Sequence, residues 1–152
     1  FPEHQLPSVS ALADGTSPLI DADAAFLRGD TVSARSQLRQ LRASGARNSP
    51  ADLTVDQLYP QAWLVAVLEG PDSAAATLNP TLDVLARSPP SLYTEAFRAG
   101  TLVRAMAFRA DLAERMGDRP AARKWAAAVV ALWSDADDFL QPLVKRMAAL
   151  AR

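Results

Sequence analysis

Residues 106–132, MAFRADLAERMGDRPAARKWAAAVVAL, carry the clearest structural pattern in the chain. It predicts two helices joined at Gly117-Asp118, because glycine accepts the left-handed conformation that ends a helix and aspartate caps the next one. Pro120 falls in the first turn of the second helix, where a missing N–H costs nothing. Alanines near the turn let two antiparallel helices approach closely. The stretch therefore predicts a tight helical hairpin.

The same pattern occurs three times, around Gly29, Gly70 and Gly117. Alanine stands four residues before and five residues after each glycine, at Ala25, Ala66, Ala113, Ala34, Ala75 and Ala122. The positions seven before and twelve after are also apolar: Ala22, Trp63, Ala110, Leu41, Leu82 and Val129. Small residues beside the turn and an apolar residue farther on suit helical hairpins that stack on each other. We expect hairpins at about 17–44, 55–87 and 93–134.

Here the chain resembles the tetratricopeptide-repeat (TPR) family. In the third hairpin Ala110, Gly117, Ala122 and Val129 match the motif, and Trp125 stands beside its usual aromatic site. The first hairpin matches at Ala22, Gly29, Ala34, Leu38 and Leu41. The middle hairpin departs at Trp63 and at Pro71. The glycines are 41 and 47 residues apart, against about 34 in the family, a spacing that would suit HEAT-like repeats equally well.

The expected fold is all-α: an α-solenoid of three stacked hairpins with a capping helix at 138–151, making one repeat domain at 17–152. The chain has 152 residues, of which 31 are alanine and 20 are leucine. Both residue types are strong helix formers, and runs of β-branched residues are absent. Residues 1–16 contain two prolines and no helical period, so we expect an extended arm there. The expected count is seven helices and no strand.

Prolines and polar residues predict the finer boundaries. Pro60 is expected to kink or delay its helix, and Pro80 to interrupt the following one. Two capping boxes are expected, at Thr54/Gln57 and at Asp138/Gln141. The last helix is expected to present one apolar face, formed by Leu143, Met147 and Leu150.

Composition excludes several kinds of chemistry. The chain has no cysteine and one histidine, His4, so it offers no thiolate site and no site with two imidazoles. We expect no enzyme, no cofactor and no bound metal. The acidic cluster Asp135, Asp137 and Asp138 lacks the glycine and glutamate of a calcium loop and is interpreted as helix capping. The net charge of -1 gives no general case for nucleic acid binding, and no apolar run is long enough for membrane insertion.

Arginines recur at helical spacing on two of the predicted helices. Arg35, Arg39 and Arg42 share a face of one helix. Four more lie along the long helix of the third hairpin, at Arg98, Arg104, Arg109 and Arg115. Such stripes could bind phosphates, but acidic residues are scattered nearby and aromatic residues are not interleaved with them. We interpret both sets as solvated helix faces.

The resemblance implies a concave groove, lined by the first helix of each hairpin, that binds a protein or peptide. Its positions here would be Leu19, Asp23, Phe26, Leu64, Val67, Arg104, Ala107, Asp111 and Glu114. This set is apolar at one end and charged at the other. Leu64 and Val67 fit a place in the core equally well.

Two functions follow as expectations. The first is a non-enzymatic scaffold that binds a protein partner through the groove. The second is a structural subunit that assembles with copies of itself, using the arm (Leu6, Val9 and Leu12) and the end faces of the solenoid. The C-terminal block also resembles repeat regions that follow signalling domains in large bacterial proteins. The chain begins at Phe1, as an excised segment or a processed and exported chain would, and its Arg and Ala bias is typical of a GC-rich bacterial genome.

Overall fold

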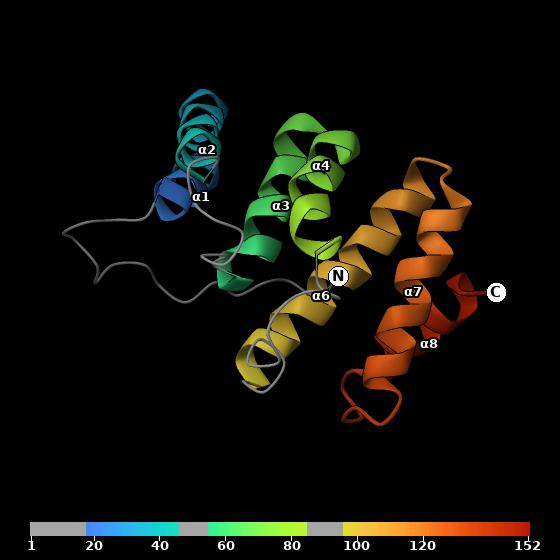
Figure 1. The fold of residues 1–152 in the computed structure, drawn as a ribbon. Coiled ribbons are helices and arrows are strands. Elements are labelled where there is room, and N and C mark those ends of the chain that lie inside the picture. Colours follow the sequence, from blue (N-terminus) through green and yellow to red (C-terminus); the bar gives the residue numbers. More distant parts are fainter. Residues whose placement is uncertain (1–17, 46–54, 85–95) are drawn as a thin grey trace. The chain divides into compact units, whose positions relative to one another are not determined.

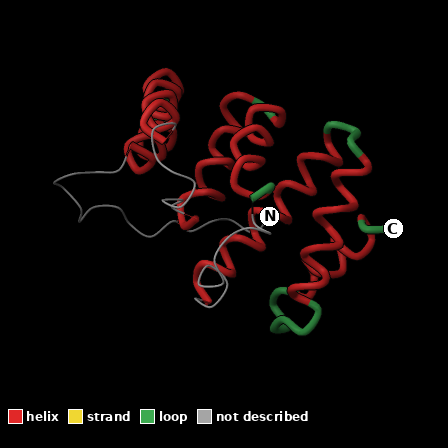
Figure 2. The backbone as a smooth tube through the Cα atoms, viewed as in Figure 1, coloured by secondary structure: helices red, strands yellow, loops and turns green. Residues whose placement is uncertain are grey.

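A computed structural model describes residues 18–45, 55–84 and 96–152, and every element in these ranges is a helix (Figures 1 and 2). The helices are α1 (Pro18–Leu27), α2 (Thr31–Gly45), α3 (Val55–Glu69), α4 (Pro71–Leu82), α6 (Ala96–Arg115), α7 (Arg119–Trp133) and α8 (Gln141–Leu150). The expected all-α class and seven helices are therefore confirmed for the described residues. None of these helices is long and apolar enough to span a membrane.

The turns after α1 and α6 have the same hydrogen bonds. Gly29 and Gly117 have φ of 79° and 77°, in the left-handed region. The next residues, Asp30 and Asp118, donate their N–H to the carbonyls of Ala25 and Ala113 at 3.0 and 2.9 Å, which closes a Schellman turn in each hairpin. The Asp30 side chain then accepts a bond from Ser33 N–H at 3.0 Å. The Asp118 side chain likewise accepts from Ala121 N–H at 3.1 Å, so the predicted cap at Asp118 is confirmed, and Asp30 caps α2 in the same way.

The middle turn is two residues shorter, because one residue instead of three separates its helices. Gly70, with φ of 98°, ends α3 and is also the N-cap of α4, which begins at once with Pro71. No side chain caps this helix. Gly70 is nonetheless the third glycine with positive φ in the described ranges, in line with the predicted repeat. The middle hairpin, which differs from the repeat pattern at Pro71 in the sequence, thus also differs from the other two in the geometry of its turn.

The chain divides into two compact units, Phe1–Ala46 and Arg47–Arg152. In the first, α1 packs on α2 through the buried residues Leu19, Ala22, Ala25, Ala34 and Leu38. Four of the six alanines flanking the turn glycines, in both units, are at most 2% exposed: Ala25, Ala113, Ala34 and Ala122. Close helix crossing therefore occurs where the pattern predicts it.

In the second unit each helix packs on its neighbours in the chain, and α6 is central. The packed pairs are α3 with α4, α3 with α6, α4 with α6, α6 with α7 and α7 with α8. The largest fully buried side chains are Leu64, Val65, Leu78, Leu102, Leu112, Val129 and Met147. Lys124 lies over the ring of buried Trp125, 4.6 Å from its centroid. Thus α6 contacts both helices of the preceding hairpin and the second helix of its own hairpin.

The expected delay at Pro60 and the expected interruption at Pro80 were wrong, whereas a kink at Pro60 stays a prediction. Helix α3 begins at Val55, so Pro60 does not delay it. Helix α4 continues through Pro80 to Leu82. A proline inside a helix forgoes one backbone hydrogen bond, but buried residues on both sides of Pro80 hold this segment in the core.

The expected capping box at Asp138 was also wrong. Helix α8 begins at Gln141, its N-cap is Leu140, and no side chain caps it. A cap at Asp138 would place Pro142 at the fourth helical position, whose N–H must donate to the cap carbonyl, and proline has no N–H. The Gln141 side chain instead donates to the carbonyl of Ala136 at 2.7 Å. Asp138 therefore lies in the turn before α8.

The expected apolar face of α8 is shifted. Its buried residues are Val144 and Met147, whereas Leu143 and Leu150 are only half-buried. Several expectations lie outside the described residues: the arm 1–16 with His4, the Thr54 cap and the start of the third hairpin at 93.

The register of the repeat predicts a strong effect of Ala122→Arg. Ala122 is 1% exposed in the crossing of α6 and α7, so an arginine there buries a charge or separates the helices. We expect a loss of about 3–5 kcal/mol in the free energy of unfolding, measured by denaturant titration. Ala127→Arg, on the exposed face of the same helix, is the control and should change stability by less than about 0.5 kcal/mol. Equal losses in both variants would contradict the register.

Candidate functional site

A cluster of polar side chains joins α3, α6 and α8. Asp111 of α6 accepts two hydrogen bonds from the guanidinium of Arg146 on α8: Nη1 donates to Oδ1, and Nη2 donates to Oδ2 at 2.8 Å. The Asp111 side chain is 13% exposed and that of Arg146 is 45% exposed. The bonds to Asp111, and the nearby charge of Glu114, raise the pKa of Arg146. The predicted groove residues Asp111 and Glu114 therefore lie together, beside a cation from another helix.

Tyr59 connects this cluster to α3. Its ring meets Phe108 of α6 edge to face, with centroids 5.7 Å apart and planes at 80°. Burial raises the pKa of the Tyr59 hydroxyl, while the Arg104 charge lowers it and the Asp111 charge raises it. The hydroxyl thus lies within the electric field of both charged groups. Arg104 and Asp111, seven residues apart on α6, share this side of the helix.

An apolar strip continues from Tyr59 along α3. Trp63 and Val67 follow it at intervals of four residues, and their side chains are 37% and 51% exposed. Nearly every other side of α3 is apolar as well, including buried Leu64 and Leu68. We define the α3–α6 surface as two groups of residues: Tyr59, Trp63 and Val67 of α3, and Arg104, Asp111 and Glu114 of α6. Its apolar part comes from α3 and its charged part from α6.

The remaining predicted groove residues are placed differently. Leu64 and Ala107 are buried at 0% and 4% exposure, so they belong to the core beneath the α3–α6 surface. In the other unit Leu19 is buried, and Asp23 and Phe26 are half-buried. Burial raises the pKa of the Asp23 carboxyl.

Arg109 contradicts the interpretation of its stripe as a solvated face. Helix α6 packs on α4 as well as on α7, so Arg109 faces α4 and is 7% exposed. Its Nε donates to Asn79 Oδ1 at 2.8 Å. Its Nη1 is buried and has no hydrogen-bond partner in the structure. A guanidinium in this position lowers stability, because desolvation of the charge is only partly compensated.

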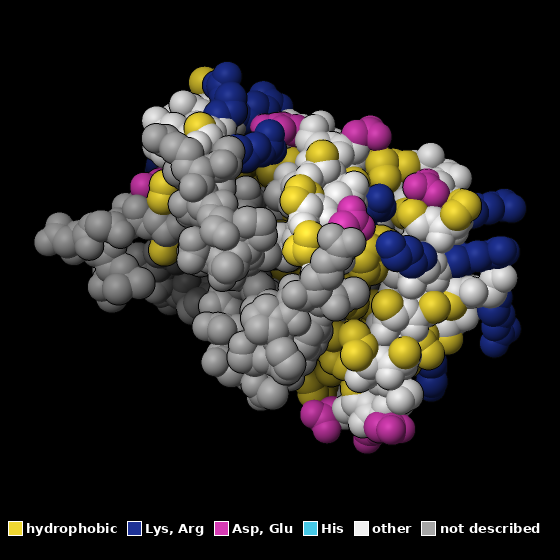
Figure 3. Space-filling model, in the orientation of Figure 1, with side chains coloured by type: hydrophobic (Ala, Val, Ile, Leu, Met, Phe, Trp, Pro, Cys, Tyr) yellow, Lys and Arg dark blue, Asp and Glu magenta, His cyan; other side chains and the backbone are white. Residues whose placement is uncertain are grey.

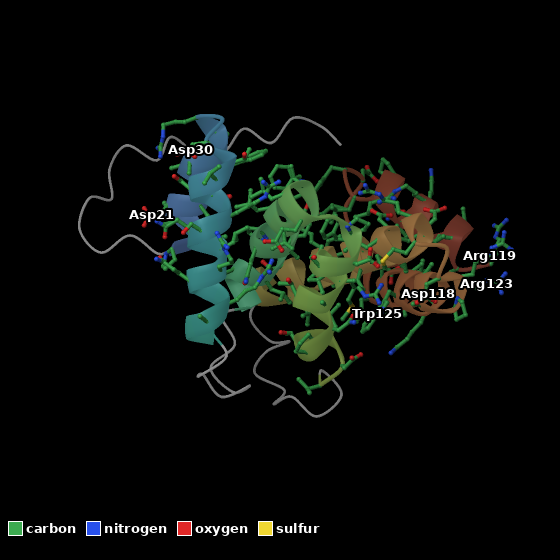
Figure 4. All side chains as sticks on the ribbon, turned by 90° about the horizontal axis from the view of Figure 1, so that it is seen from above. Asp21, Asp30, Asp118, Arg119, Arg123 and Trp125 are labelled. Atoms are coloured by element: carbon green, nitrogen blue, oxygen red, sulfur yellow. The ribbon has the colours of Figure 1, made fainter. Side chains whose placement is uncertain are left out.

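Most of the other charged side chains are exposed, but Arg42 is half-buried, so the first predicted arginine stripe is not solvated along its whole length. Arg119 and Arg123 project from the start of α7 (Figure 4), and Lys and Arg side chains line the edge of the molecule near α7 and α8 (Figure 3). Asp135, Asp137 and Asp138 are exposed in the turn before α8 and do not cap it, in contrast to the prediction. Among the described residues no group of three His, Cys, Asp or Glu could hold a metal ion.

Sequence reasoning missed Tyr59, Trp63 and Arg146 as members of the site. Tyr59 and Trp63 had a usable signal, because they precede the predicted Val67 at helical spacing. Arg146 had none, since its partner Asp111 is 35 residues away. Comparison of the chain with models of known families, with curated proteins and with solved structures finds no match.

Asp23 predicts a pH-dependent contribution to stability. A raised pKa in the folded state favours the protonated carboxyl, so this contribution is full below the unfolded pKa of 3.8 and is lost as pH rises through the folded value. Asp23→Asn, which resembles the protonated form, should be more stable than the parent at pH 7 and equal to it near pH 3.5. The gain should stay below about 1 kcal/mol, because a half-exposed group is screened. Thermal melting at both pH values measures it, with exposed Asp135→Asn as the control; a gain at pH 3.5 as large as at pH 7 would refute the prediction.

Substitutions of Arg109 and of its hydrogen-bond partner Asn79 should have opposite effects on the stability of the protein. Asn79→Ala removes the hydrogen-bond acceptor of Arg109 and should cost about 1–3 kcal/mol. Arg109→Met keeps much of the packing and removes the charge, so stability should be unchanged or higher. In the Arg109→Met background, Asn79→Ala should cost less than in the parent, because the two effects are coupled. Denaturant titration of the four proteins measures this coupling, and strictly additive effects would disprove it.

Proposed function

We propose that the chain is a non-enzymatic helical-repeat scaffold of the TPR type that binds a protein or peptide partner at the α3–α6 surface. The observation that carries this proposal is the pair of exposed apolar residues Trp63 and Val67, which continue along α3 from Tyr59, the residue near the charges of Arg104 and Asp111. A helix that is apolar on nearly all sides is normally covered on all sides. Exposed apolar residues rimmed by charges are typical of binding surfaces.

The helix contacts support the repeat interpretation. The first helices of the last two hairpins, α3 and α6, pack on each other, and each also packs on the second helix of its own hairpin. Helix α4 packs on α6, as successive hairpins do in a stacked array. In such an array the first helices form one continuous surface, which matches the side where Tyr59 meets Arg104 and Asp111. A solenoid is the architecture that we propose on these grounds.

Self-assembly is the second candidate function. Phe139 and Leu132 are 73% and 54% exposed near the carboxyl end of α7, next to the acidic turn. Arginines project from the opposite end of α7. Two complementary patches at opposite ends of one helix suit a head-to-tail contact between copies.

The binding proposal is tested by peptide selection. A displayed library of random peptides is selected on the immobilised chain, and the affinity of the selected peptides is measured in solution. Val67→Asp should weaken them at least tenfold, because it places a charge in the apolar strip. Leu132→Asp makes the same change at an equally exposed position of α7 and should leave affinity within twofold.

The alternative outcomes separate the two functions. Equal affinity of parent and Val67→Asp for all selected peptides would refute binding at the α3–α6 surface. Light scattering over a concentration series gives the mass of the chain in solution. A constant mass near 16.3 kDa supports a binding module, and a mass that rises with concentration and falls in Phe139→Asp supports self-assembly.

A further inference from the structure

A side chain of helix α8 already occupies the charged part of the α3–α6 surface. The Arg146 side chain reaches from α8 to α6 and engages both carboxylate oxygens of Asp111. Such a two-pronged contact has a specific geometry, which a guanidinium provides and an ammonium does not. Asp111 is 13% exposed, so a cation beside it compensates for lost hydration. The charged part of this surface is thus suited to a guanidinium.

Helix α8 makes few stabilising contacts with the rest of the structure. The helix has ten residues, of which only Val144 and Met147 are buried. Arg146 is 45% exposed, and ion pairs that are open to water contribute little to stability. Helix α8 packs mainly on α7, whereas α6 and α7 pack extensively on each other. The Arg146–Asp111 contact can therefore open without disrupting the α6–α7 hairpin.

We propose that α8 is an internal competitor for the α3–α6 surface, and that a partner binds there by placing its own arginine on Asp111 in place of Arg146. This inference rests on the proposed function and specifies the partner as a basic amphipathic segment. Once Arg146 has left, Asp111 and Glu114 outnumber Arg104 in the charged part, so the surface attracts a cation. Apolar residues of the partner would contact Trp63 and Val67. Helix α8 has the same combination of residues, because its Arg146 lies between the buried apolar residues Val144 and Met147.

The test uses the full chain and a labelled peptide with its own sequence 141–152, QPLVKRMAALAR. Fluorescence anisotropy measures peptide affinity for the parent chain, for Arg146→Gln and for Lys145→Gln. Arg146→Gln vacates Asp111 and should bind the peptide at least tenfold more tightly than the parent. Lys145→Gln removes the same charge from an exposed position of α8 and should behave like the parent.

A second variant covers the case in which α8 stays docked through its apolar residues. Arg146→Gln combined with Met147→Asp also removes the buried anchor, and should bind the peptide more tightly than Arg146→Gln alone. A peptide with glutamine at the position of Arg146 should bind this double variant at least tenfold more weakly than the native peptide. Hydrogen exchange of the α8 amides should be faster in Arg146→Gln than in Lys145→Gln.

Equal peptide affinity across the parent and all variants would overturn the competition, as would equal binding of the two peptides. These results would not contradict the proposed function if Val67→Asp still weakened the affinity of the library-selected peptides. Conversely, tight binding of the native peptide to the double variant that is insensitive to Val67→Asp would support competition for Asp111 while refuting the role of the apolar strip.

Discussion

Reversal of the chain at a glycine with positive φ determines how the helices of each hairpin pack. In the hairpins of α1–α2 and α6–α7 the same two backbone bonds close the turn, and an aspartate starts the next helix immediately afterwards. So short a turn leaves no room to adjust the helices, which must cross within about two turns of the glycine. Only small residues fit there, and Ala25, Ala34, Ala113 and Ala122 are buried as a result.

The surface that we assign to binding is a consequence of this packing. Alanines at the crossings allow α6 to contact α3, α4 and α7 together, which brings Tyr59 near Arg104 and Asp111. The middle hairpin breaks the pattern, because tryptophan replaces alanine seven residues before the glycine. In the other two hairpins Ala22 and Ala110 are completely buried, while Trp63 is partly exposed. The position that departs from the repeat thus contributes one of the exposed residues of the apolar strip.

Local rules predicted much of the fold and less of the site. Gly29, Gly117, Asp30 and Asp118 were predictable because a left-handed turn and a helix cap depend on a few neighbouring residues. The cap at Asp138 failed for an equally local reason, since Pro142 cannot donate to it. Contacts between segments that are distant in the sequence could not be predicted from such local rules.

Two arginines illustrate this limit. Arg109 and Arg146 both occur in helices with an ordinary alternation of charged and apolar residues. Whether such a side chain meets water, Asn79 or Asp111 depends on the helix that packs against it, and the partners here are 30 and 35 residues away. Helical periodicity identifies the face on which a residue lies, but the identity of the neighbour comes only from the assembled structure.

The division of the chain into two compact units has a consequence for how it unfolds. The described core of the first unit consists of three alanines and two leucines on a single hairpin, whereas the second unit shares its core among five helices. Structures in which each element depends mainly on its neighbours lose cooperativity, and a single melting temperature then no longer describes them. We therefore expect the α1–α2 hairpin to open before the α6–α7 hairpin on heating, and a protease to cleave it first under native conditions.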